Sequence, residues 1–210
     1  MIKKHLPLLI VTSIVIVLPI LVGLLLWNQL PDALPIHWNA EGEVDGYSSK
    51  PFAVFAMPLI LLAVHWLAAV VTQTDPKKQN QPEKVKILVF WLIPAISLLV
   101  NLFTYSAALG KSLRVETVMP IFMGLLFMAI GNYLPKCKQN YTVGIKLPWT
   151  LHSEENWNRT HRLAGWLWVG GGLLCAVAGF FGAFLLTVPV LLVMALVPMI
   201  YSFLLYKKGV

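Results

Sequence analysis

Six long apolar segments limit what this chain can fold into more than any other feature. They cover Leu6–Trp27, Pro51–Gln73, Ile87–Leu109, Thr117–Leu134, Leu163–Phe180 and Phe184–Tyr206. About 20 apolar residues in a helix cross the hydrocarbon core of a bilayer, whereas open strands would leave their edge amides unpaired there. With 58% hydrophobic and 12% charged residues among 210, the chain is too apolar for a soluble domain. The sequence therefore predicts an all-α integral membrane protein with six transmembrane helices.

The basic residues are unevenly divided between the two ends of these helices. An orientation with the N-terminus inside places 13 of the 16 Lys and Arg residues in the cytoplasm and 3 outside. Cytoplasmic loops of membrane proteins carry this excess, so both termini are expected inside. The net charge of +7 thus reflects topology. A nucleic-acid partner is not expected, because no basic stripe alternates with base-stacking aromatic residues.

The outer loop, residues 28–50, has the composition of an ordered segment. Two prolines, Asn39 and two glycines supply turn-forming residues, and the loop also carries four acidic residues, Asp32, Glu41, Glu43 and Asp45. We interpret it as a recognition surface for a secreted cationic or amphipathic peptide, with binding residues His37, Trp38, Asn39, Asp45 and Tyr47. Residues 1–73 then form an N-terminal helical hairpin that carries this loop.

A metal site is the alternative for part of this loop. His37 together with Glu41, Glu43 or Asp45 supplies candidate ligands, but no cysteine or second histidine lies nearby to complete a set. We therefore favour packing and hydrogen bonding of His37 and Trp38 at the membrane interface. Neither a metal nor another cofactor is predicted.

The inner stretch 131–165 is polar and basic between two apolar segments. Pro135 ends the preceding helix because it lacks an amide donor, and the residue before Pro148 is pushed towards extended backbone. A new helix is predicted after Ser153, whose hydroxyl can accept a free amide of the first turn. Basic residues of this stretch are expected at the edge of the bilayer, near lipid headgroups.

Helical spacing divides the residues that follow Ser153 between two faces. Trp157, His161, Ala164 and Trp168 share one face, and Asn158 and Arg162 share another. An acid–base group of Glu155, His161 and the nearby arginines is an alternative interpretation. We favour a salt-bridged helix start, because the chain contains none of the usual catalytic motifs. The chain is not predicted to be an enzyme.

Four further expectations concern the rest of the chain. We expect His65 to be neutral and bonded to a neighbouring helix, and Asn101 and Thr104 to form bonds between helices. Residues Thr74–Lys86 are interpreted as a solvated connector. The glycines of the fifth segment predict close, central packing; they are Gly165, Gly170, Gly171, Gly172 and Gly179. Cys137 and Cys175 are not expected to form a disulfide.

The inner stretch also carries a resemblance. Gly144-Ile145-Lys146-Leu147-Pro148-Trp149-Thr150-Leu151, followed by Asn156-Trp157-Asn158-Arg159-Thr160-His161-Arg162, resembles the cytoplasmic signature G-x-R-T-P-W-T-L…N/W-W-x-x-x-x-R of the bacterial SdpI family. Two positions depart from it, since Lys146 replaces the arginine and Leu147 the threonine. Lysine keeps the charge but loses the bidentate fork of arginine. Leu30–Asn39 and Asp45–Lys50 are similar to a domain of unassigned function (DUF1648-type) that often precedes this signature.

The resemblance implies a function and a partner on each side of the membrane. The SdpI family comprises multi-pass immunity proteins of the bacterial cell membrane that resist the secreted SDP toxin, and its best-known members also recruit a small cytoplasmic repressor. It implies a four-helix region over residues 87–210, with the signature at 131–162. The residues implied for the cytoplasmic partner are Lys146, Pro148, Trp149, Thr150, Asn156, Trp157, Arg159, His161 and Arg162. Alternative functions are a small-solute or ion transporter and an intramembrane enzyme; the inverted repeats and broken helices of a transporter are not evident.

Overall fold

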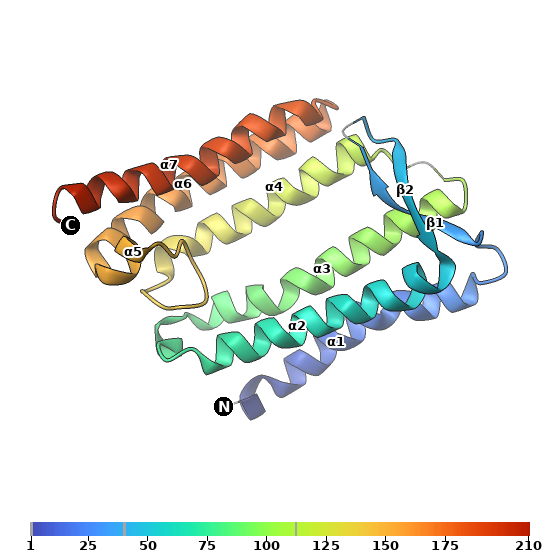
Figure 1. Ribbon diagram of the computed structural model, residues 1–210, viewed down its shortest axis with the longest axis horizontal. Coiled ribbons are helices and arrows are strands. Elements are labelled where there is room, and N and C mark those ends of the chain that lie inside the picture. The colour runs from blue at the N-terminus through green and yellow to red at the C-terminus, as the bar shows by residue number, and fades with distance from the viewer. Residues whose placement is uncertain (1, 40, 112) are drawn as a thin grey trace. The chain divides into compact units, whose positions relative to one another are not determined.

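The computed structural model describes residues 2–39, 41–111 and 113–210, except for the side chains of residues 2–4 (Figure 1). Within these residues, six helices are long and apolar enough to cross a membrane. The predicted all-α membrane architecture is therefore confirmed, and the chain is a multi-pass membrane protein. The long helices are α1 (Ile2–Leu25), α2 (Met57–Thr74), α3 (Glu83–Ala108), α4 (Val115–Tyr133), α6 (Glu154–Phe180) and α7 (Thr187–Lys207).

Short elements join the long helices. The outer loop contains two strands, β1 (Ala33–Trp38) and β2 (Val44–Ser49), and a π-helical turn, η1 (Phe52–Ala56), that leads into α2. One-turn 3₁₀ helices are η2 (Lys78–Asn80), η3 (Leu134–Lys136) and η4 (Phe184–Leu186), and α5 (Pro148–His152) is a short helix before α6. The loop was predicted to be ordered, but its strands were not predicted.

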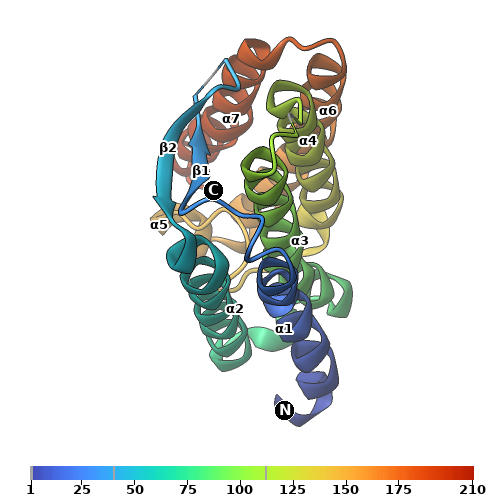
Figure 2. The same cartoon turned by 90° about the vertical axis from the view of Figure 1, so that its right-hand side faces the viewer.

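The chain forms two compact units. The first contains residues 1–73 and 87–115, and the second contains residues 74–86 and 116–210. In the first unit the hairpin β1–β2 lies at one end of α1, α2 and α3 (Figures 1 and 2). In the second unit α6 and α7 run side by side, and α5 lies near the end of α7 that carries the C-terminus.

The hairpin rests on a small apolar core of the first unit. Leu30, Leu34, Ala53, Val54 and Tyr105 form a buried cluster beneath it. The two strands are antiparallel, and their register is irregular between Pro35 and Trp38. Such irregularity bends a strand and increases its twist. The apolar cluster therefore fixes the base of the hairpin, while its tip stays polar.

Side-chain hydrogen bonds join the helices of the first unit within the apolar region. His65 Nε2 lies 2.9 Å from the hydroxyl oxygen of Thr12 on α1, which confirms the expected bond to a neighbouring helix. Ser97 donates to the carbonyl of Ile16, and the hydroxyl of Tyr105 donates to that of Pro19. The prediction for Asn101 was wrong: its amide donates within α3, to the carbonyl of Ser97.

Glycines bring the backbones of α4 and α6 together in the second unit. A Cβ atom built on Gly172 would lie 2.5 Å from the carbonyl oxygen of Gly124, and one on Gly165 would lie 3.0 Å from that of Gly131. Gly179 faces the carbonyl of Thr117 at 2.9 Å in the same way. The three glycines of α6 are spaced by seven residues, so they lie on one face of the helix. The predicted close packing of this helix is confirmed.

Candidate functional site

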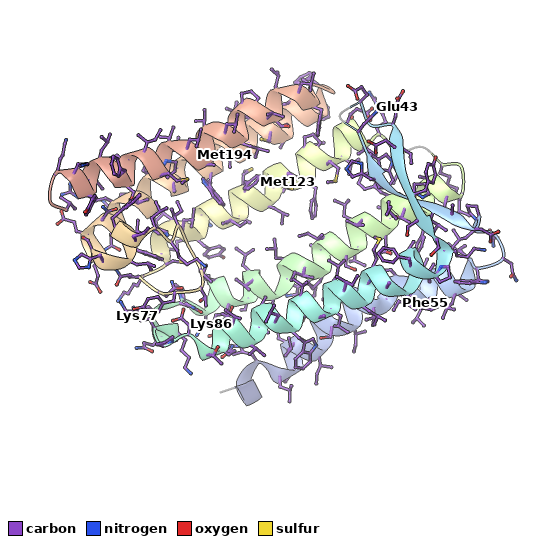
Figure 3. The ribbon with its side chains drawn as sticks, viewed as in Figure 1. Glu43, Phe55, Lys77, Lys86, Met123 and Met194 are labelled. Atoms are coloured by element: carbon purple, nitrogen blue, oxygen red, sulfur yellow. The ribbon has the colours of Figure 1, made fainter. Side chains whose placement is uncertain are left out.

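The tip of the hairpin is a tight turn built by Asn39. Its side-chain oxygen accepts hydrogen bonds from the amides of Glu41 and Glu43, at 3.1 and 2.9 Å. The amide of Asn39 also donates to the carbonyl of Glu43 at 2.9 Å. Asn39 therefore shapes the turn, and the acidic side chains of Glu41 and Glu43 remain exposed. Figure 3 shows Glu43 at this tip.

The predicted binding residues of the hairpin differ in exposure. His37 Nδ1 lies 2.5 Å from a carboxylate oxygen of Asp45 across the two strands, and both side chains are exposed. Tyr47 is also exposed, whereas Trp38 is half-buried with its ring 5.9 Å from that of Phe103 on α3. Trp38 thus anchors the hairpin to α3, whereas His37, Asp45 and Tyr47 are exposed.

A lysine ties the two ends of the outer loop together. Lys50 Nζ donates to the carbonyl of Trp27 at 3.2 Å and lies 3.6 Å from a carboxylate oxygen of Asp32. Its ammonium is also 5.2 Å from the centre of the Trp27 ring, within the range of a cation–π contact. The loop is therefore closed by contacts as well as by its strands.

In the second unit, the signature folds around one buried tryptophan. Trp157 is fully buried, and its indole N–H donates to the carbonyl of Cys137 at 2.7 Å. Its ring stacks on that of His161 with centroids 4.0 Å apart. Burial raises the pKa of the Cys137 thiol to about 11, so this group stays protonated and unreactive at neutral pH.

His161 joins the signature loop to α6. Its Nε2 accepts the amide N–H of Ile145 at 2.9 Å, and its Nδ1 lies 2.8 Å from the carbonyl of Trp157. A backbone amide can only donate, so Nε2 carries no proton and Nδ1–H donates to Trp157. His161 is therefore a neutral, structural histidine, and the geometry disfavours the alternative in which it acts as an acid–base group.

Two more signature residues organise the backbone. The hydroxyl of Thr150 accepts from the amide of Leu147 and donates to the carbonyl of Ile145, at 2.8 and 2.9 Å. The side-chain amide of Asn156 donates to the carbonyl of Ser202 on α7, whose hydroxyl donates back to Asn156 at 2.6 Å. Ser153 accepts from the amide of Asn156 as the predicted cap of α6.

The exposed members of the predicted partner-binding set form a different group. Lys146, Pro148, Arg159 and Arg162 are exposed, and Trp149 is half-buried against Phe203 and Tyr206. Arg159 forms an ion pair with Glu155 at 2.5 Å, which agrees with the interpretation of a salt-bridged helix start. The Lys146 ammonium donates to the carbonyl of Thr142. Of the arginines, Arg162 has its guanidinium unpaired among the described residues.

The connector after α2 is part of this loop, contrary to the expectation that it is solvated. Asp75 is only 3% exposed, and so is Gln81. The carboxylate of Asp75 accepts from the amides of Lys77 and Tyr141, from the hydroxyl of Thr142 and from the side chain of Gln81. Burial by itself raises the pKa of Asp75, but these four donors together hold it below its ordinary value.

Further polar contacts extend this network towards the signature. Lys77 Nζ donates to the side-chain oxygen of Gln139 at 2.5 Å, and the amide of Gln139 donates to the carbonyls of Thr150 and Leu151. Figure 3 shows Lys77 beside this loop. The burial of Asp75, Gln81 and Gln139 was not predicted, because polar residues usually contact solvent and no local pattern in the sequence indicates otherwise.

Comparisons with known proteins agree with both motifs. Residues 136–202 match the model of the SdpI/YfhL protein family, and residues 14–62 match a domain of unknown function, DUF1648. The chain is similar to the Immunity protein SdpI of Bacillus subtilis (strain 168), with 26% identity over 205 residues that cover 95% of this chain and 96% of the relative.

The chain therefore contains a region similar to the SdpI/YfhL protein family and is similar to an immunity protein along most of its length. No solved structure matches it. In this chain, the signature residues that are buried position the loop, and the remaining ones form the surface available to other molecules. The six apolar helices and this similarity identify the chain as a multi-pass protein of a bacterial membrane.

Proposed function

We propose that the protein confers immunity to a secreted toxic peptide, which it meets at the outer hairpin. The observation that carries this proposal is an ordered, acidic hairpin on a membrane protein that matches an immunity protein over 95% of its length. The tip exposes Glu41 and Glu43, and one strand face exposes the His37–Asp45 pair and Tyr47. Carboxylates of this kind attract a cationic peptide and increase its association rate.

The proposed orientation places the hairpin outside the cell and the signature inside. Within the second unit, the end that carries the signature contains 11 basic residues, and the η4 end contains none. The 11 are Lys77, Lys78, Lys84, Lys86, Lys136, Lys138, Lys146, Arg159, Arg162, Lys207 and Lys208. This bias supports a cytoplasmic signature.

Removing the outward-facing groups of the hairpin tests immunity. A triple variant carries His37→Ala, Asp45→Ala and Tyr47→Ala. We expect the highest concentration of SDP toxin at which cells still grow to fall at least tenfold, because the exposed polar and aromatic contacts are removed. Growth of a toxin-sensitive strain that expresses each variant measures this. The control is Ser49→Ala, exposed on the same strand.

A cysteine at Glu43, labelled by an impermeant reagent on intact cells, checks abundance and orientation together. Full protection by the triple variant would move recognition away from the hairpin.

We further propose that the exposed cations of the signature dock a small cytoplasmic repressor. Arg162 supports this, because its guanidinium is exposed and unpaired among the described residues. Lys138 is exposed on the loop that precedes α5, and the half-buried Trp149 supplies an aromatic group of the kind that is enriched at interfaces. The remaining signature residues of the predicted set act indirectly, by holding this surface in place.

Charge reversal tests docking separately from immunity. Lys146→Glu with Arg162→Glu is expected to reduce the response of a repressor-controlled reporter about tenfold, since attraction becomes repulsion, while protection is retained. Lys84→Glu with Lys208→Glu, also exposed at this end, is the matched control. Lys146→Arg distinguishes two modes: increased capture would indicate bidentate binding of a carboxylate or phosphate. Joint loss of protection and abundance in the first variant would indicate a purely structural role.

A further inference from the structure

A pocket of about 260 Å³ lies between the hairpin and the outer end of α3. Its walls lie within the first unit and include Trp38 and Val44 from the hairpin, and Phe103, Ala107 and Lys111 from α3 and the turn that follows it. Pockets that enclose a whole drug-sized ligand measure about 300–1,000 Å³. This pocket is smaller, and its mostly apolar walls match one bulky apolar side chain.

The charges around the pocket are divided between its two sides. The Lys111 ammonium has no partner among the described residues, and its residue is exposed. Lys111 also lines a second pocket of about 310 Å³ between α1 and α3, whose walls include Leu18, Leu102 and Leu109. On the hairpin side, the exposed carboxylates of Glu41 and Glu43 flank the pocket wall formed by Gly42. The Lys111 ammonium therefore lies between two apolar cavities. It faces an acidic rim that consists of Glu41 and Glu43.

This pattern favours a peptide over a phospholipid as the occupant. An anionic lipid headgroup would meet the carboxylates of the hairpin tip, and like charges at short range repel. A peptide can present an apolar side chain, a carboxylate and a basic group at separate positions along its chain. Pockets for individual side chains and capture of a terminal carboxylate are both recurring features of peptide recognition.

We propose that the pocket receives one large apolar side chain of the toxic peptide, and that Lys111 binds an adjacent carboxylate. This inference rests on the proposed immunity function and specifies the ligand chemistry of its site. Trp38 forms part of the pocket wall and contacts the apolar group, while the acidic rim pairs with a basic residue of the peptide. The carboxylate is supplied either by the end of the peptide or by an acidic side chain.

Filling the pocket is the main test. Ala107→Leu adds three carbons to its wall, whereas Ala33→Leu makes the same change at an exposed strand position outside it. Fluorescently labelled SDP toxin is titrated against the purified, full-length protein in nanodiscs. Ala107→Leu is expected to weaken binding at least tenfold, because lost apolar fit in a pocket has effects of about 10–200-fold. Ala33→Leu is expected to bind as the wild type does.

Two further variants, at another wall of the pocket and at the cation, test the proposal without relying on Ala107→Leu. Leu113→Trp narrows the pocket from another side, where the chain is exposed and tolerant of change, and the same loss is expected. Lys111→Gln is expected to weaken binding about fivefold at low salt and less at high salt, as for a screened ion pair. Toxin that is amidated at its carboxyl terminus distinguishes the two sources of the carboxylate. Its affinity for the wild-type protein should be about fivefold lower if the terminus binds Lys111, and unchanged if an acidic side chain does.

The outcomes separate the two proposals. Normal binding by both pocket-filling variants, with reduced binding by the hairpin triple variant, would overturn the pocket inference and leave immunity at the hairpin intact. Failure of the wild-type protein to bind the toxin would overturn both. Loss of binding by both pocket-filling variants, with wild-type affinity for Ala33→Leu, supports the pocket.

Discussion

Gly144→Ala is expected to destabilise the protein by about 3 kcal/mol or more, the largest effect of any single methyl group added to the signature. Gly144 has φ +123°, a conformation that residues with a Cβ rarely adopt. The new Cβ would lie within 2.9 Å of the Trp157 ring and even closer to His161 Nε2. Strain of about 1–3 kcal/mol then adds to overpacking of about 1–3 kcal/mol.

Gly182→Ala is the matched control for this substitution. Gly182 also has a positive φ, +69°, but a Cβ there would meet nothing within 4 Å. Only the conformational cost of about 1–2 kcal/mol remains. Thermal unfolding in detergent, followed by tryptophan fluorescence, compares the two variants. Equal losses would mean that the packing of Gly144 on the Trp157–His161 pair contributes nothing to stability.

The second large effect is expected at the carboxylate that orders the connector. Asp75→Asn should cost about 2–4 kcal/mol, because an amide nitrogen replaces an oxygen that faces donors, and a buried bond to a charged group contributes about 1.5–3 kcal/mol. The loop 139–143 would lose its attachment to the connector at Asp75. Thermal unfolding measures the loss, and limited proteolysis is expected to cut the variant between Gln139 and Lys146.

The pH dependence provides an independent check with a defined sign. The pKa of Asp75 is lower in the folded protein than its ordinary value of 3.8. The folded state therefore binds fewer protons than the unfolded state in this range, and the contribution of Asp75 is complete above about pH 4 and lost as the pH falls below it. Asp75→Asn should flatten this part of the profile. An unchanged profile in Asp75→Asn would contradict the network.

Local patterns in the sequence predicted much of the fold and the second half of the signature. The six spans follow from apolar length, and the start of α6 follows from the cap at Ser153. The division of α6 into a buried face with Trp157, His161 and Ala164 and an exposed face with Asn158 and Arg162 follows from helical spacing. Each of these features depends on residues close together in the chain.

Features that depend on distant residues were not predictable in the same way. Asp75 meets Tyr141 and Thr142, which lie 66 and 67 positions further along the chain. The strands of the hairpin contain Pro35 and Gly46, which weaken any strand pattern, and they form because Leu34 packs on a buried cluster that includes Tyr105 of α3. Recognition of Thr150 and Asn156 as structural residues likewise required the positions of their backbone partners.

The seven-residue spacing of Gly165, Gly172 and Gly179 restricts how the second unit can move. A slide of α6 along α4 by one helical turn, about 5.4 Å, would bring larger residues such as Val169 and Ala176 to the places where carbonyl oxygens now approach the glycines. The two helices are thus interlocked along their length, and we expect them to shift as one rigid body. The signature loop, fastened to α6 through His161, must travel with that body. We therefore expect any movement of the loop within this unit to be a tilt or rotation of the α4–α6 pair, and not a sliding of one helix past the other.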